Sequence, residues 1–124
     1  MSRVLLVDDD EICNFIMSRT LKNIVSDLEI LTAMNGKEAI NLLKDLITKN
    51  LEMPLIIFLD INMPVMDGFG FLAAYNGMDG PKLDIKIVVV SSSSHSQDII
   101  KAKSEGVSDF LSKPIDEKML SKFF

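Results

Sequence analysis

The sequence has one cysteine, no long hydrophobic run and no cluster of basic residues. Cys13 has no second cysteine to pair with, so an internal disulfide is excluded and a reducing compartment is expected. No apolar run reaches the roughly 20 residues that a membrane-spanning helix needs, and the N-terminal segment MSRVLL lacks the signal-peptide pattern. The 13 Lys and Arg residues are scattered and the net charge is −5, which does not favour a nucleic-acid surface. We expect a cytoplasmic protein that contacts neither nucleic acid nor membrane.

The remaining composition suits one compact domain. The chain has 124 residues, of which 48% are hydrophobic, and a chain of this length buries roughly two-thirds of its unfolded surface. We therefore predict a single domain, residues 1–124. Cys13 is predicted to be a small buried apolar residue, because the sequence places neither a second cysteine nor a cation beside it.

Short apolar runs alternate with longer amphipathic ones. Runs rich in Val, Ile, Leu and Phe predict strands that are mostly buried on both faces, at residues 3–8, 28–33, 55–60, 85–91 and 107–112. Helices are predicted at 11–24, 36–49, 68–77, 95–105 and from about 116 through 124.

Two helix starts have recognisable signals. Asp10 is the expected N-cap of the first helix, whose apolar stripe begins with Ile12, Phe15 and Ile16 and continues through residues 19–21. The fourth helix is expected to open with a capping box from Ser94 to Gln97.

Strands that alternate with helices in this way predict an α/β fold, a doubly wound parallel sheet with helices on both faces. In such sheets the functional crevice lies beyond the carboxyl ends of the strands. Each polar residue that follows a strand is, taken alone, an ordinary cap, turn or solvated residue. Their joint occurrence indicates a site at that edge, formed by Asp8, Asp9, Asp60, Ser91 and Lys113.

The first strand ends in three consecutive carboxylates, Asp8, Asp9 and Asp10. Two like charges about 4 Å apart cost on the order of 4 kcal/mol at an effective dielectric constant near 20. Either another group shares the site or the side chains point apart. A hard divalent cation would remove the repulsion, and Asp10 would then remain as the helix cap.

The chain resembles the receiver domain of two-component response regulators, including the single-domain chemotaxis type. The resemblance covers essentially the whole chain and rests on the acidic pair in LVDDD, the segment LDINMPVMDG at 59–68, the hydroxyl residue that ends VVVS at 88–91, and DFLSKPI at 109–115 with its Lys-Pro. It implies a flavodoxin-like sheet of five parallel strands in the order 2-1-3-4-5 with five helices.

On this resemblance Asp60 is the phosphoacceptor, and Lys113 is the phosphate-binding group that acts with it in catalysis. The metal site consists of Asp8, Asp9, Asp60 and the main-chain carbonyl of Asn62, with Asp8 acting largely through water. Carboxylates can act as nucleophiles and form aspartyl phosphates. Mg²⁺ is the expected cofactor, because it prefers oxygen ligands and binds one or two carboxylates together with phosphate oxygens.

The resemblance also implies a switch. Ser91, with Ser92 beside it, is the switch hydroxyl, and Phe110 is the switch aromatic, although Phe lacks the hydroxyl of the Tyr that many members have. Asn62 and Ser93 border the path of the hydrolytic water in this family. Because both are small, neutral and polar, we expect a short-lived phosphoryl group.

The expected partners are a histidine kinase or histidine phosphotransfer protein as donor, and an effector that binds the face formed by the fourth helix, fifth strand and fifth helix. A donor histidine normally lies on a helical bundle of another protein, so His95 is predicted to be a solvated loop residue. We expect a phosphorylation-controlled signalling switch rather than an enzyme, with only self-phosphorylation and self-dephosphorylation chemistry. The sequence does not distinguish a stand-alone domain from part of a longer regulator.

Other classes share parts of this pattern. A phosphohydrolase with an Asp nucleophile also uses Mg²⁺, but it commonly has a second acid where this chain has Asn62, and a cap domain. A flavodoxin-like FMN module needs a phosphate-cradling loop after the first strand, where DDDE would repel phosphate. A degenerate receiver used only as a scaffold is disfavoured because every site residue is present.

Overall fold

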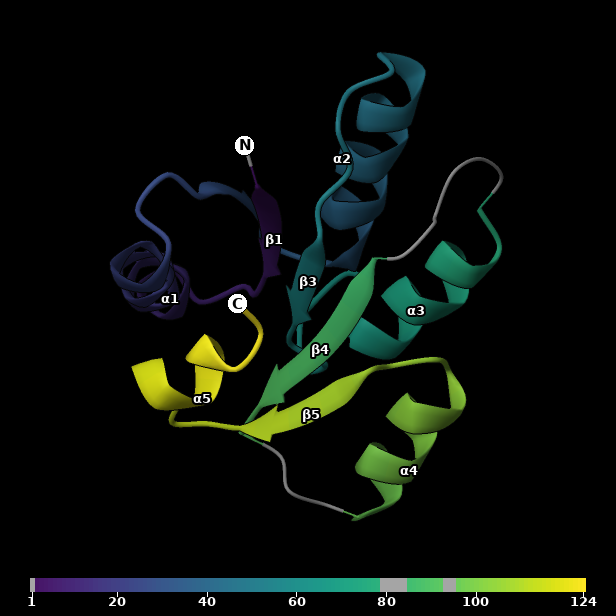
Figure 1. The fold of residues 1–124 in the computed structure, drawn as a ribbon. Helices are drawn as coiled ribbons and strands as arrows, with labels where there is room; N and C mark the ends of the chain where they lie inside the picture. The colour runs from purple at the N-terminus through teal and green to yellow at the C-terminus, as the bar shows by residue number, and fades with distance from the viewer. Residues whose placement is uncertain (1, 79–84, 93–95) are drawn as a thin grey trace.

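A parallel five-stranded sheet forms the centre of the computed structural model, which describes residues 2–78, 85–92 and 96–124 (Figure 1). The strands are β1 (Arg3–Val7), β2 (Glu29–Ala33), β3 (Ile56–Leu59), β4 (Lys86–Ser91) and β5 (Asp109–Ser112), in the spatial order β2-β1-β3-β4-β5. The helices within the described residues are α1 (Glu11–Ile24), α2 (Gly36–Thr48), α3 (Gly68–Asn76), α4 (Ser96–Ser104) and α5 (Glu117–Ser121). The predicted fold class and strand order are confirmed.

Two apolar clusters sandwich the sheet. Because successive side chains of a strand point to opposite faces, Leu5 and Val7 join one cluster whereas Val4 and Leu6 join the other. Helices α2, α3 and α4 cover the first face, and α1 and α5 cover the second (Figure 1). Burial on both faces explains the nearly continuous hydrophobic runs of the central strands.

The edge strands differ from the prediction of burial on both faces. Only Ala33 of β2 and only Leu111 of β5 are fully buried, whereas all of β3 is buried. An edge strand has a neighbour on one side alone, so its side chains are covered less completely. The prediction therefore holds for the central strands and is wrong for β2 and β5.

Helix α5 is shorter than predicted. It ends at Ser121, and the chain continues in tight turns in which the N–H of Phe123 donates to the carbonyl of Leu120 at 3.1 Å. The Phe123 ring packs edge-on against Phe58 of β3, with centroids 6.0 Å apart. Phe123 thus packs against the second cluster from a turn, whereas Phe124 is exposed, and the helix does not extend to residue 124.

The apolar stripe predicted for α1 is wrong at Ile12, Phe15 and Ile16 and right at Leu21. Ile12, Phe15 and Ile16 are 69%, 61% and 53% exposed, whereas Asn14 and Leu21 are buried. The buried face follows positions 14, 17, 21 and 24, whose spacings of three and four also fit a helix. The predicted N-cap is confirmed, because the Asp10 carboxylate accepts hydrogen bonds from the N–H groups of Ile12 and Cys13.

Three residues named in the sequence analysis lie outside the described residues. Ser93, Ser94 and His95 are not described, so the capping box and the loop position of His95 stay predictions.

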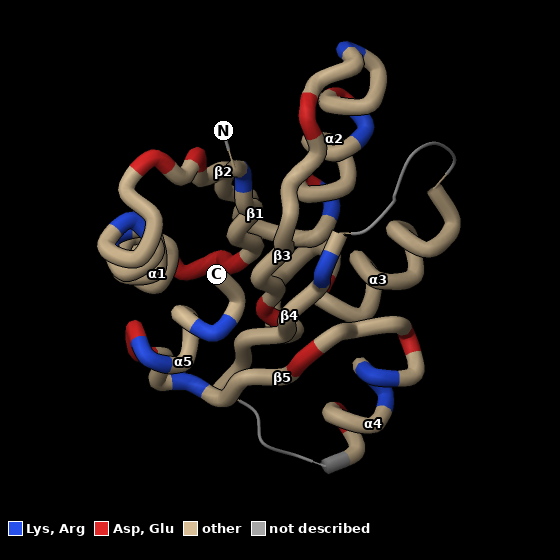
Figure 2. The backbone as a smooth tube through the Cα atoms, in the orientation of Figure 1, with Lys and Arg blue, Asp and Glu red and all other residues tan. Residues whose placement is uncertain are grey.

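Lys and Arg are spread over several elements of the described chain (Figure 2). No helix in the described ranges is both long and apolar enough to cross a bilayer.

The two faces of α1 should differ sharply in their contribution to stability. Leu21→Ala removes a completely buried side chain and should lower the free energy of unfolding by about 3 kcal/mol. Ile16→Ala removes a half-exposed one and should cost less than about 1 kcal/mol. Urea denaturation followed by circular dichroism measures both, and equal losses would contradict the assigned packing face.

Candidate functional site

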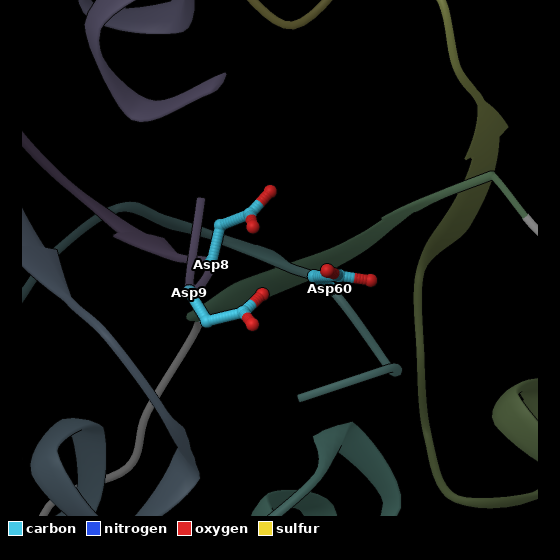
Figure 3. A group of neighbouring side chains, drawn as sticks. All are labelled: Asp8, Asp9 and Asp60. Atoms are coloured by element: carbon cyan, nitrogen blue, oxygen red, sulfur yellow. The ribbon is translucent and has the colours of Figure 1, made fainter. Parts of the chain in front are cut away.

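Three carboxylates meet at the carboxyl ends of β1 and β3. Asp8 and Asp9 follow β1, and Asp60 follows β3. One oxygen of each lies within 4.8 Å of the others, with Asp8 and Asp60 buried and Asp9 exposed (Figure 3). The hydrogen-bonded ladder fixes this arrangement, because the N–H of Asp60 donates to the carbonyl of Val7 at 2.9 Å. The sequence prediction that these residues share one edge is confirmed.

Lys113 brings a positive charge to the same edge from the end of β5. Its Nζ lies 2.9 Å from Oδ2 of Asp8 and 4.0 Å from Oδ2 of Asp60. The main-chain N–H of Lys113 donates to the carbonyl of Ser91 at 2.9 Å, which fixes the residue beside β4. The peptide bond between Lys113 and Pro114 is cis.

Asp8 has both oxygens engaged. Oδ1 accepts a hydrogen bond from the N–H of Asp10 at 2.9 Å, and Oδ2 accepts from Lys113. Asp60 is less fully paired within the described residues, since the N–H of Asn62 donates to Oδ1 at 3.1 Å and Lys113 lies 4.0 Å from Oδ2. The Asp60 oxygens are therefore engaged less fully than those of Asp8, and Asp9 is the exposed member of the cluster.

The environment shifts the pKa values of two of these groups. Burial raises the pKa of Asp60, and the charges of Asp8 and Asp9 add to the effect, while the hydrogen bond from Asn62 and the charge of Lys113 oppose it. Burial alone would lower the pKa of Lys113, but the hydrogen bond and the charge of Asp8, together with that of Asp60, outweigh burial and raise it. Lys113 therefore stays protonated at neutral pH.

The predicted switch residues lie on the neighbouring strands. Ser91 ends β4 and is completely buried, and Ser92 beside it is exposed. The amide Nδ2 of Asn62 donates to Oγ of Ser91 at 3.4 Å. Phe110 of β5 is half-buried and packs against the first apolar cluster.

Cys13 differs from its prediction. Its side chain is only partly buried, and its Sγ lies 3.8 Å from Nζ of Lys113 and donates to Oδ2 of Asp10 at 3.3 Å. Lys113 is 100 positions away from Cys13 in the sequence, so the residues next to Cys13 in the sequence give no indication of this cation. Burial, followed by the Asp10 hydrogen bond, raises the pKa of the Cys13 thiol, so the thiol is protonated at neutral pH.

Asn14 is a supporting residue that the sequence analysis missed. Its buried amide donates to the main-chain carbonyl of Asp8 at 2.9 Å and so ties the acidic turn to α1. The sequence does contain one indication of its burial: Asn14 lies seven positions before Leu21, which places both side chains on one helix face.

Comparisons with known proteins agree on one family. The family model described as the response regulator receiver domain matches residues 4–124. A transcriptional regulatory protein, PrrA of Mycobacterium tuberculosis, is 38% identical over 112 residues, which is 90% of this chain and 43% of that protein. A hybrid signal transduction histidine kinase, G of Dictyostelium discoideum, is 34% identical over 95% of this chain and 3% of its own length. The chain thus spans less than half the length of these relatives.

Solved structures give the same result. A two-component response regulator from Cytophaga hutchinsonii superposes with a TM-score of 0.87 at 31% identity, covering 98% of this chain and 92% of that one. The chemotaxis protein CheY4 of Vibrio cholerae has a TM-score of 0.82 at 28% identity, covering 99% and 95%. The similarity extends over whole chains in both cases.

The raised pKa of Asp60 predicts a pH-dependent gain in stability on its neutralisation. In the folded state the carboxyl binds a proton more readily than in the unfolded state, so ionised Asp60 destabilises the fold above its folded pKa. Without divalent cations, Asp60→Asn should be more stable than the wild type at pH 7. The gain should disappear as the pH falls through the folded pKa toward the ordinary value of 3.8.

Thermal unfolding at a series of pH values in the presence of EDTA measures this difference. Asp27→Asn is the matched control, because Asp27 is exposed and lies in the turn after α1. A gain for Asp60→Asn that is the same at every pH would contradict the assigned electrostatic cause.

Proposed function

The chain belongs to the response regulator receiver domain family, a family of signalling switches, and on this premise we propose that it accepts a phosphoryl group on Asp60. The observation that supports this most strongly is the environment of Asp60. It is a buried carboxylate 4.0 Å from the Lys113 ammonium, and its oxygen lies within 4.8 Å of those of two further carboxylates.

Mg²⁺ fits the donor set of this site. Asp9 is exposed, Asp60 has an oxygen whose nearest cation, Lys113, is 4.0 Å away, and the carbonyl of Asn62 completes the proposed direct ligands. Both oxygens of Asp8 are engaged by Asp10 and Lys113, which supports contact through water for this residue. When bound, the ion offsets the carboxylate charge and polarises the phosphoryl oxygens.

The remaining steps belong to the protein's own side chains. An oxygen of Asp60 attacks phosphorus, a P–O bond to Asp60 forms, and the bond from phosphorus to the donor breaks with its electrons leaving on the donor. The Lys113 ammonium stabilises the charge on the phosphoryl oxygens, and the Ser91 hydroxyl donates to one of them. In this proposal Ser91 shifts toward the phosphoryl group, and Phe110 is the ring that can follow it.

The proposed donor is a histidine kinase or a histidine phosphotransfer protein that acts in the cytoplasm. The exposed side chains of Ile12, Phe15 and Ile16 on α1 support a protein donor, because Ile16 borders a hollow that reaches Lys113 and Asp8. The proposed effector surface is the face of α4, β5 and α5, with no direct contact to nucleic acid by this domain. The short phosphoryl lifetime stays a prediction, since Ser93 lies outside the described residues.

Phosphorylation of Asp60 can be tested with acetyl phosphate. In the presence of Mg²⁺, intact-mass spectrometry should show one added phosphoryl group on the wild type and none on Asp60→Asn. Omission of Mg²⁺ should reduce labelling strongly, because the carboxylates then repel the incoming anion. Labelling of Asp60→Asn to the wild-type extent would overturn the assignment of the nucleophile.

The metal site can be tested separately. Asp9→Ala should weaken Mg²⁺ binding by at least about tenfold, because it removes an oxygen ligand from the site. Asp45→Ala is the matched control, since Asp45 is an exposed carboxylate paired with Lys49. Isothermal titration calorimetry measures both, and equal affinities for the two variants would exclude Asp9 as a ligand.

A further inference from the structure

The β3–α3 loop, residues 60–67, contains both Asp60 and Asn62 and is attached to the start of α2. The main-chain N–H of Gly36, the first residue of α2, donates to the carbonyl of Met66 at 2.9 Å. This bond joins two crossover connections that leave different strands of the sheet. The loop that holds the proposed phosphoacceptor therefore has a fixed point outside the acidic site.

The side chain of Met66 occupies a niche between two glycines. A Cβ atom on Gly36 would lie 2.8 Å from Cγ and 2.9 Å from the carbonyl oxygen of Met66. A Cβ atom on Gly70 of α3 would lie 2.9 Å from the same Cγ. These distances are shorter than a carbon–carbon contact allows, so both positions must lack a side chain for Met66 to remain where it is.

The residue before Met66 shows that the loop needs such a fixed point. Val65 has a φ of 66° and is 80% exposed, and the N–H of Met66 donates back to the carbonyl of Pro64 at 2.7 Å. A β-branched residue is strained at positive φ, and a strained backbone persists only where its surroundings hold it. The exposed Val65 side chain supplies no such contact, whereas Met66 packs against the first apolar cluster.

We propose that Met66, seated between Gly36 and Gly70, is the anchor that sets the position of Asp60 and of the Asn62 carbonyl for metal binding. Met66, Gly36 and Gly70 are thus positioning residues that touch neither metal nor phosphoryl group. The inference rests on the proposed function, because it explains how the same site is held ready for Mg²⁺.

Gly70→Ala is the decisive variant. Ala has a higher helix propensity than Gly, and Gly70 lies within α3, so this gain offsets part of the cost of the clash with Met66 and thermal stability should change little. The added Cβ should displace Met66, and the dissociation constant for Mg²⁺ should rise by on the order of tenfold. A merely structural role would move stability and affinity in the same direction.

Gly77→Ala is the matched control at the end of the same helix. Its Cβ would meet only carbonyl oxygens at 3.6 and 3.7 Å, which are ordinary contacts, so Mg²⁺ affinity should not change. Isothermal titration calorimetry measures the affinity, and the dependence of acetyl phosphate labelling on Mg²⁺ concentration gives a second readout.

A double-mutant cycle tests the contact between Gly36 and the side chain of Met66. Met66→Ala alone should weaken Mg²⁺ binding, and it should have a smaller effect in the Gly36→Ala background, where Met66 is already displaced. Additive effects would contradict the anchor. If Gly36→Ala does not fold, Gly70→Ala with Met66→Ala provides the same cycle from the other side of the niche.

These experiments distinguish a failure of the proposed function from a failure of the Met66 anchor. Wild-type protein that neither binds Mg²⁺ nor accepts phosphate would overturn the proposed function. Wild-type protein that does both, together with a Gly70→Ala variant of unchanged Mg²⁺ affinity, would overturn the anchor alone.

Discussion

Repulsion among Asp8, Asp9 and Asp60 is the constraint on which the site depends. Parallel pairing of β1 with β3 sets Val7 opposite Leu59, so the residues that follow them are forced into proximity. Burial makes the charge on Asp60 still more costly. Lys113 offsets only part of this negative charge. The edge of the sheet therefore favours the binding of a cation, and a bound cation would in turn favour the binding of an anion.

Hydrogen bonds at the same edge of the sheet link Asp60 to β4 and to Lys113. Asn62 donates from its main chain to Asp60 and from its side chain to Ser91, so one residue touches both the nucleophile and the buried hydroxyl of β4. Ser91 in turn accepts, through its carbonyl, the N–H of Lys113. Direct contacts therefore link Asp60 through Asn62 of the β3–α3 loop to Ser91 at the end of β4.

Sequence patterns were sufficient for the sheet and for its polar edge, because strand ends in a parallel sheet necessarily lie together. They were insufficient in α1, where Ile12, Phe15 and Ile16 of the predicted stripe proved exposed and the polar Asn14 proved buried. The roles of Cys13 and Asn14 depend on contacts with residues that fold against them. The niche around Met66 depends on the approach of two helices, and no local pattern encodes that distance.

The ion pair between Lys113 and Asp8 joins positions 105 residues apart. Lys113 follows β5, and the pairing of β5 with β4 brings it to the edge where Asp8 lies. A chain without β5 and the residue after it retains Asp8, Asp9 and Asp60 but lacks the Lys113 ammonium. Copies that are truncated, or that fail to add the final strand, lack the ion pair altogether, so the complete site is also a signature of a finished fold.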